Sequence, residues 1–393
     1  MNQQVHDFID FVCDNNALNT KEELISLAKE RFDLTQDGKA LYRNDYFCCR
    51  FCYSKNKSFS NVVLSLSRLE KYDHIPCFVV IVRKDLDNLI YMINSTFIDK
   101  ISHSSQKLSL TNIRGSFLGG NIRKDISELN KRNEPKDFDD LFAYHQGFTW
   151  QENLERLVEK THNIKPTKKK VTLTEDEERR LFDSPSRAAA FISSEDYRTL
   201  SQDLNSRCKE VKDAIICAAH IENTNVRGRL IEVLITSSPE ERVRLLKDLR
   251  EMEKELPTYD TKNDIGDYVR SFSNTKTYTD IKTKVLYLGS NPKAYNIDKF
   301  LTCMSESDSV FMFYFVGIDE SDEVTTALVS VYDSRLIDNT IPQMHWSGRG
   351  TRGSAQLNGS CINDLLEQSY EGVFTNKIEV DKSCKFLKDL LER

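Results

Sequence analysis

The chain has 393 residues, of which 39% are hydrophobic and 30% charged, and its net charge is −6. This length suits two domains better than one ordinary hydrophobic core. The longest apolar runs, 77–82 and 310–318, have the length of strands and are too short to cross a bilayer. The segment 1–12 carries acids where a secretory signal would be basic and then apolar, so we expect a cytoplasmic protein. The net charge neither indicates nor excludes nucleic acid as a partner.

The N-terminal part combines helical and strand patterns. Apolar residues recur three and four apart in 5–32, and helical patterning returns at 136–160. Between them, 41–123 contains β-type runs separated by turn residues. Its closely spaced cysteines would need further ligands at matching spacing to bind zinc, so an aromatic-rich strand explains them better. We therefore expect 1–162 to form a separate β-rich domain.

A second domain follows the polar stretch 163–178, which is basic, then acidic, and typical of a linker. Residues 175–256 have an almost entirely helical pattern. From 265 onward the pattern predicts strands, with one helix at 294–305 between the second and the third. The sequence thus predicts an α/β (α+β) protein whose second domain comprises 179–393.

Charged residues interrupt the second predicted strand of this domain. Asp280 and Lys282 are two positions apart, so they lie on one strand face, directly before the apolar run 285–288, which we interpret as the buried end of this strand. This run and the apolar third strand at 310–318 together predict a central position in the sheet. A tight turn between two antiparallel strands would bring Asp267, at the start of the preceding strand, close to Asp280. Buried charges are costly unless they pair or bind something, so we interpret this group as holding a divalent metal and an attacking water.

Phosphodiester hydrolysis suits these residue types. Mg²⁺ binds carboxylate oxygens and keeps several waters. The ion neutralises charge on the phosphate and lowers the pKa of the attacking water, while a nearby lysine orients that water or stabilises the charged oxygens. A polar stripe on the preceding helix adds further candidates, although a solvated helix face is the alternative; the stripe consists of Glu222, Asn225, Arg229 and Glu232.

Asp267, followed by Asp280-Ile281-Lys282, resembles the signature of the PD-(D/E)XK nucleases. Gly266 stands where that signature has a proline. Either Asp264 or Asp267 fits the first acid, and we favour Asp267 because it opens an apolar strand. With its separate N-terminal domain, the chain is similar to a bacterial type II restriction endonuclease.

The resemblance covers about residues 180–393 and implies a mixed-sheet core flanked by helices. It implies that Asp267 and Asp280 bind Mg²⁺, with Asp264 as the alternative ligand, and that Lys282 assists the water. Glu222 or Glu232 then completes the site. The expected substrate is double-stranded DNA, and a homodimer is expected because a palindromic target has two-fold symmetry.

Two regions are candidates for contacts with DNA. The glycine-rich segment 343–359 contains Arg and Gln side chains, which suit guanine and adenine, although it also fits an ordinary surface loop. The segment 94–122 is rich in hydroxyl, amide and basic side chains, which commonly contact phosphates and base edges, although it also fits a β-domain with polar loops. The candidate residues are His345, Trp346, Arg349, Arg352 and Gln356 in the first region and Lys100, His103, Lys107 and Arg114 in the second.

Three functions remain open. The first is a Mg²⁺-dependent, sequence-specific double-strand DNA endonuclease. The second is a nuclease that depends on base modification, for which an aromatic pocket within 41–123 would read the altered base. The third is a non-catalytic DNA-binding protein with a nuclease-like fold, which the presence of Asp267, Asp280 and Lys282 disfavours.

Overall fold

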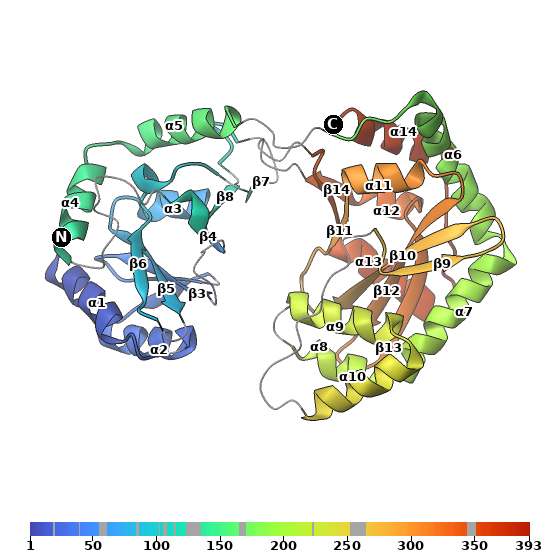
Figure 1. The fold of residues 1–393 in the computed structure, drawn as a ribbon, viewed down its shortest axis with the longest axis horizontal. Coiled ribbons are helices and arrows are strands. Elements are labelled where there is room, and N and C mark those ends of the chain that lie inside the picture. The colour runs from blue at the N-terminus through green and yellow to red at the C-terminus, as the bar shows by residue number, and fades with distance from the viewer. Residues whose placement is uncertain are drawn as a thin grey trace. The chain divides into compact units, whose positions relative to one another are not determined.

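The computed structural model describes residues 1–18, 20–38, 40–54, 61–83, 86–101, 103–104, 108–113, 115–122, 135–164, 170–221, 224–251, 265–343 and 351–393. The chain is a mixed α/β protein that divides into two compact units between 169 and 170 (Figure 1). This division falls within the predicted linker 163–178. The linker is shorter than expected, because helix α6 (Glu175–Ile192) begins directly after Thr174, whose side chain accepts a hydrogen bond from the Glu177 N–H.

A five-stranded sheet forms the centre of the N-terminal unit, in the order β1-β2-β3-β5-β6. β3 and β5 are parallel, whereas the other neighbours are antiparallel. These strands are β1 (Thr35–Asp37), β2 (Leu41–Arg43), β3 (Cys48–Ser54), β5 (Cys77–Arg83) and β6 (Leu89–Met92). A second sheet has the order β4-β8-β7 and comprises β4 (Val62–Ser65), β8 (Gly115–Leu118) and β7 (His103–Ser104).

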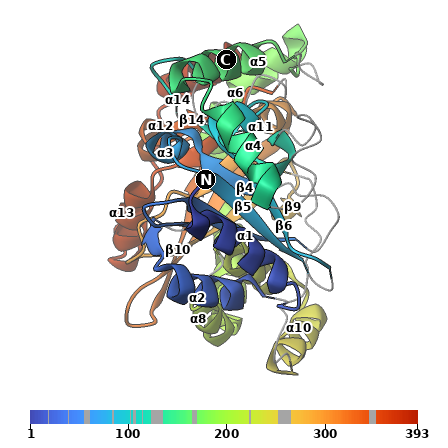
Figure 2. The same cartoon turned by 90° about the vertical axis from the view of Figure 1, so that its left-hand side faces the viewer.

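Alternating side chains place a separate core on each face of the larger sheet. One core joins Phe78 and Val80 of β5 to α1 (Gln3–Asp14), α2 (Lys21–Phe32) and α4 (Pro135–His145). Figures 1 and 2 show α1 and α2 side by side. The other core joins Cys77 and Val79 to α3 (Leu66–Tyr72), α5 (Trp150–His162) and the smaller sheet. Short 3-10 turns form η1 (Ser95–Phe97) and η2 (Gly119–Asn121). The expected β-rich domain is thus an α/β unit, because helices from both of its ends supply core layers.

A four-stranded mixed sheet forms the centre of the C-terminal unit, in the order β13-β12-β10-β9. Its strands are β9 (Tyr268–Ser271), β10 (Lys276–Val285), β12 (Ser309–Ile318) and β13 (Val324–Ser330). β10 is antiparallel to β9 and parallel to β12, so it occupies the predicted interior position. The predicted continuation of this strand to 288 is wrong. β10 ends at Val285, and Tyr287 and Leu288 are 49% and 42% exposed because the chain turns away from the sheet.

Helices flank this sheet, as Figure 1 shows. Besides α6 they are α7 (Glu195–Glu210), α8 (Lys212–Ala219), α9 (Thr224–Thr236), α10 (Pro239–Glu251), α11 (Ile297–Met304), α12 (Ser334–Asp338), α13 (Gly359–Tyr370) and α14 (Val380–Leu391). A small sheet, in the order β11-β15-β14, comprises β11 (Lys293–Asn296), β15 (Ser354–Leu357) and β14 (Thr340–Gln343). Among the described residues, no helix combines the length and apolar character that a bilayer crossing requires.

Candidate active site

The hairpin of β9 and β10 brings Asp267 to Asp280. Tyr268 pairs with Thr279, so the next step of the antiparallel register places the two aspartates opposite each other. The backbone N–H of Asp267 donates to the Thr279 carbonyl at 2.8 Å, and the Asp267 Oδ2 accepts from the Ile281 N–H at 2.7 Å. Asp267 is therefore fixed to β10 through both its backbone and its side chain. The alternative ligand Asp264 lies outside the described residues.

Gly266 allows the chain to enter this hairpin. Its φ is +83°, in the left-handed region that favours glycine. A Cβ at this position would lie 3.1 Å from the Tyr278 Cβ and 3.2 Å from the Thr279 nitrogen. The glycine that departs from the nuclease signature is thus required by the local backbone.

Asp280 and Lys282 lie on one face of β10, as the strand period predicted. The Lys282 Nζ is 2.6 Å from the Asp280 Oδ2, and Asp280 as a residue is only 8% exposed. The two side chains therefore form a close ion pair that is largely withdrawn from solvent.

Glu232, on α9, adds a third carboxylate to this group. In Figure 1, α9 lies beside β10, and the Glu232 carboxyl lies within hydrogen-bonding reach of Asp267. Burial raises the pKa of Glu232 to about 7, and the charges of Asp267 and Asp280 add to this against the opposing charge of Lys282. Burial also raises the pKa of Asp280 to about 7, with Lys282 opposing and Asp267 contributing. Burial first, and the neighbouring carboxylates second, therefore disfavour the charged forms of Glu232 and Asp280.

Lys282 remains protonated in this group. Burial alone would lower its pKa, but the carboxylates of Asp280 and Asp267 outweigh that effect and raise it. One ammonium thus faces three carboxylates, and the cluster of Glu232, Asp267, Asp280 and Lys282 has an excess of negative charge. Such an excess in a low-dielectric site favours a bound cation.

The cluster fits a magnesium ion through two carboxylates. Among the described residues, no group of three or more Asp, Glu, His or Cys side chains is arranged to hold a metal. Mg²⁺ does not require such a group, since it is commonly bound by one or two carboxylates with waters completing its octahedral shell. Asp267 and Asp280 supply those two carboxylates, and the cluster has only the Lys282 ammonium to offset three carboxyl groups, so a cation would complete its charge balance.

Two of the predicted DNA contacts have other partners in the structure. The Arg352 side chain is 10% exposed, and its guanidinium donates to the Asp298 Oδ1 at 2.5 Å. It also donates to the carbonyls of Leu391 at 3.1 Å and Val171 at 2.9 Å. Through these bonds Arg352 connects α11, which carries Asp298, with α14 and with the first residues of the C-terminal unit. Gln356 donates to the Asn291 carbonyl at 2.8 Å and accepts from Gln343. Arg352 thus has structural partners and Gln356 is engaged within the small sheet, while a DNA contact by either residue stays a prediction.

The structure describes only two of the other candidate site residues. Lys100, which follows η1, is half-buried, and His103 lies in β7. The rest lie outside the described residues: Glu222, Lys107, Arg114, His345, Trp346 and Arg349.

Sequence reasoning missed Lys284, which shares the face of β10 that carries Asp280 and Lys282 and is only 3% exposed. The signal was available, because side chains that project to one face of a strand recur every second residue.

One cavity of the N-terminal unit bears on the question of a modified base. It has a volume of ≈ 250 Å³ and lies between β3 and β4. Its polar lining consists of Asp37, Arg50, Ser65 and Arg68, and none of the described residues that line it is aromatic. The cavity therefore lacks the stacking surface that we expected of a reader of altered bases.

A comparison of the sequence with known protein families and with curated proteins finds no match. The chemistry and geometry of the residues themselves therefore carry the functional argument.

Proposed function

We propose that the C-terminal unit is a Mg²⁺-dependent endonuclease that hydrolyses phosphodiester bonds of double-stranded DNA, as the resemblance to PD-(D/E)XK nucleases implies. The observation that carries this proposal is the hairpin that holds Asp267, Asp280 and Lys282 together beside Glu232. In this proposal, the mixed sheet of β9, β10, β12 and β13, with its flanking helices, corresponds to the mixed-sheet core that the resemblance implies.

Each side chain of the cluster has a role in this proposal. Asp267 and Asp280 would hold Mg²⁺, which when bound lowers the pKa of water and neutralises charge on the phosphate. Lys282 supplies a charged hydrogen-bond donor, which would orient the attacking water or stabilise the phosphate oxygens. Glu232, whose pKa is raised to about 7, suits the transfer of a proton near neutral pH, since a general base works best when its pKa lies close to the working pH.

The proposal extends to the assembly of the protein and to the role of the N-terminal unit. We expect a cytoplasmic homodimer that acts on a palindromic sequence, with one copy for each DNA strand. The N-terminal unit would contribute affinity or specificity. The cavity beside Arg50 and Arg68 offers charge for a phosphate but no aromatic surface for a modified base, so unmodified DNA is the favoured substrate.

Digestion of plasmid DNA by the full chain tests this function. Unmodified and methylated plasmids are incubated with Mg²⁺ or with EDTA, and the ends of any product are sequenced. We expect the unmodified plasmid to be cut at defined sites with Mg²⁺ and to stay intact with EDTA. Cleavage of methylated plasmid alone would favour the modification-dependent alternative. Binding without cleavage of either plasmid would favour the non-catalytic alternative.

A further inference from the structure

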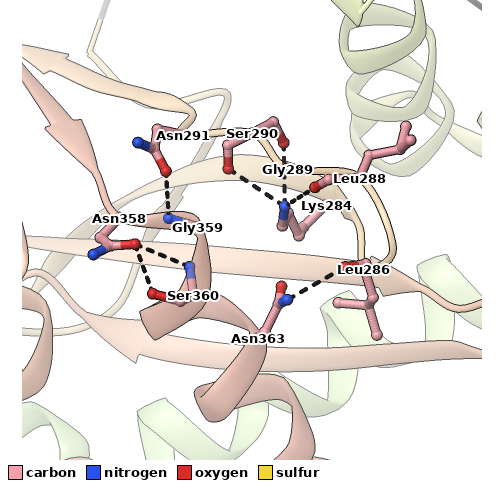
Figure 3. Close-up of a pocket in the computed structure, with 10 residues that line it drawn as sticks. All are labelled: Lys284, Leu286, Leu288, Gly289, Ser290, Asn291, Asn358, Gly359, Ser360 and Asn363. Atoms are coloured by element: carbon pink, nitrogen blue, oxygen red, sulfur yellow. Dashed lines mark hydrogen bonds between the residues drawn. The ribbon is translucent and has the colours of Figure 1, made fainter.

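A polar cavity lies at the end of β10, close to the candidate active site. It has a volume of ≈ 450 Å³ and is formed by β10, the loop that follows it and the start of α13 (Figure 3). Its lining includes Lys284, Ser290, Asn291, Asn358, Ser360 and Asn363. None of these residues belongs to the cluster described above.

Lys284 brings a buried positive charge to this cavity. Its Nζ donates to the carbonyl of Leu288 and, at 3.3 Å, to both the carbonyl and the Oγ of Ser290 (Figure 3). These acceptors are neutral, and the described residues provide no carboxylate in an ion pair with Lys284. Burial lowers the pKa of Lys284, and the charge of Arg227 on α9 lowers it further. Lys284 thus has no counter-ion among the described residues, an arrangement that a bound anion would stabilise.

The wall of the cavity is held in place before any ligand binds. The Asn291 Oδ1 accepts from the Gly359 N–H at 2.9 Å, and the Asn358 Oδ1 accepts from the Ser360 N–H at 3.0 Å (Figure 3). A Cβ at Gly359 would lie 2.0 Å from the Ser290 carbonyl oxygen, so this close approach requires glycine. The Asn363 Oδ1 is buried without a partner among the described residues, which leaves one polar atom for a ligand or a water.

The cavity lies along the same face of β10 as the cluster of Glu232, Asp267, Asp280 and Lys282. Asp280, Lys282 and Lys284 project from one face of β10, and each step of two residues along a strand advances roughly 7 Å. α9 runs in the opposite direction to this strand, so that Glu232 interacts electrostatically with Asp280 and Lys282, and Arg227 with Lys284. The face therefore changes from excess negative charge at Asp280 to excess positive charge at Lys284.

We propose that this cavity binds a phosphate group of the DNA strand, next to the phosphate that is hydrolysed. The positive charge of Lys284, the hydroxyl of Ser290 and the positive end of the α13 dipole suit a phosphate oxyanion. The charge of Arg227, which does not line the cavity, adds to the positive potential. The inference rests on the proposed function in naming DNA as the source of the phosphate, whereas the cavity itself requires only an anion.

Asn358→Asp tests the site with little risk to the fold. Asn358 is the N-cap of α13, and Asp caps a helix as well as Asn does, so stability should be maintained. The new carboxylate would repel a phosphate in the cavity. Asn296→Asp is the matched control, because Asn296 is the N-cap of α11 and does not line the cavity. Binding of the full chain to a short duplex of mixed sequence is measured in EDTA at several salt concentrations.

We expect Asn358→Asp to weaken binding about fivefold or more at low salt. The slope of log K against log salt should fall by about 0.9, as for the loss of one phosphate contact. Asn296→Asp should change neither quantity. Equal losses in both variants, or no loss in Asn358→Asp, would overturn the proposal.

Thermal unfolding in inorganic phosphate separates this inference from the proposed function. Phosphate should raise the Tm of the wild type and of Asn296→Asp but not that of Asn358→Asp. If the wild type binds no duplex even at low salt while this pattern holds, the nuclease proposal fails and the anion site stands. If phosphate raises all three Tm values equally, the anion site is refuted whatever the DNA result.

Discussion

Two buried groups of charges in the C-terminal unit differ in how their charges are balanced. Asp298 and Arg352 form a pair of one carboxylate and one guanidinium, and the Asp298 Oδ2 also accepts from the Arg352 backbone N–H at 3.0 Å. The cluster at Asp280 and Lys282 combines three carboxylates with one ammonium, and two of its carboxylates have pKa values of about 7. Burial is common to both groups. Imbalance of charge is what distinguishes a candidate site from a structural ion pair.

Substitutions in the unbalanced cluster should have the largest effect. Lys282→Ala and Asp280→Ala should each reduce DNA cleavage by at least about 10³-fold, because each removes a group that stabilises the transition state. The circular dichroism spectrum should stay that of the wild type. Lys293→Ala, which removes an exposed lysine from β11, is the control. Cleavage at the wild-type rate in either cluster variant would show that the active site lies elsewhere.

Removing one partner of the balanced pair should affect stability. Arg352→Ala leaves the buried Asp298 carboxylate unpaired and should lower the free energy of unfolding by about 3 kcal/mol. Urea denaturation measures this loss, and the double variant Asp298→Asn/Arg352→Ala should recover part of it. Cleavage per folded molecule should not change. Reduced DNA binding at undiminished stability would instead restore the sequence-based prediction that Arg352 contacts DNA.

The smallest effect that we expect concerns the pH dependence of stability without metal. The folded-state pKa of Glu232 is raised to about 7, above its ordinary value of 4.5, so the folded protein binds more protons than the unfolded chain between these values. Its contribution to stability is therefore most favourable at low pH and is lost as pH rises towards 7. Glu232→Gln should remove the destabilisation that the charged form of Glu232 causes at higher pH.

Thermal unfolding in EDTA from about pH 4 to about pH 9 measures this difference. The Tm of Glu232→Gln should match that of the wild type at about pH 4 and exceed it by a few degrees above about pH 7. Glu320→Gln, which removes a carboxylate from an exposed position after β12, is the control. The same pH-dependent gain in that control, or a constant difference in Glu232→Gln across the range, would contradict the assignment.

The part of the site that could be predicted is the part fixed by short-range order. A strand period of two places Asp280 and Lys282 on one face, and a tight turn pairs Asp267 with Asp280, so this geometry follows from residues within one hairpin. The interior position of β10 followed from the apolar run that became β12. The predicted helix at 294–305 is confirmed as α11, although the first three residues of the predicted range belong to strand β11.

The errors arose where distant residues decide the structure. The pairing of Arg352 with Asp298, 54 positions away, was not foreseen, because the sequence shows only the glycine-rich context of Arg352. The continuous helical pattern across 208–236 gave no sign that α8 ends at Ala219 and α9 begins at Thr224, because apolar spacing persists on both sides of the break. The apolar residues 286–288 looked like strand, but no neighbouring strand extends that far.

The backbone at Gly266 also bears on how this active site can be recognised in other chains. Proline holds φ near −65°, whereas Gly266 has a φ of +83°, so the residue named first in the nuclease signature cannot stand here without rebuilding the hairpin. The aspartate next to it is nevertheless fixed by the same strand that carries Asp280 and Lys282. In this chain a glycine at positive φ therefore precedes the acid. If the proposed function holds, a search pattern that demands the proline would miss this chain, whereas the spacing of the acids and the lysine would find it.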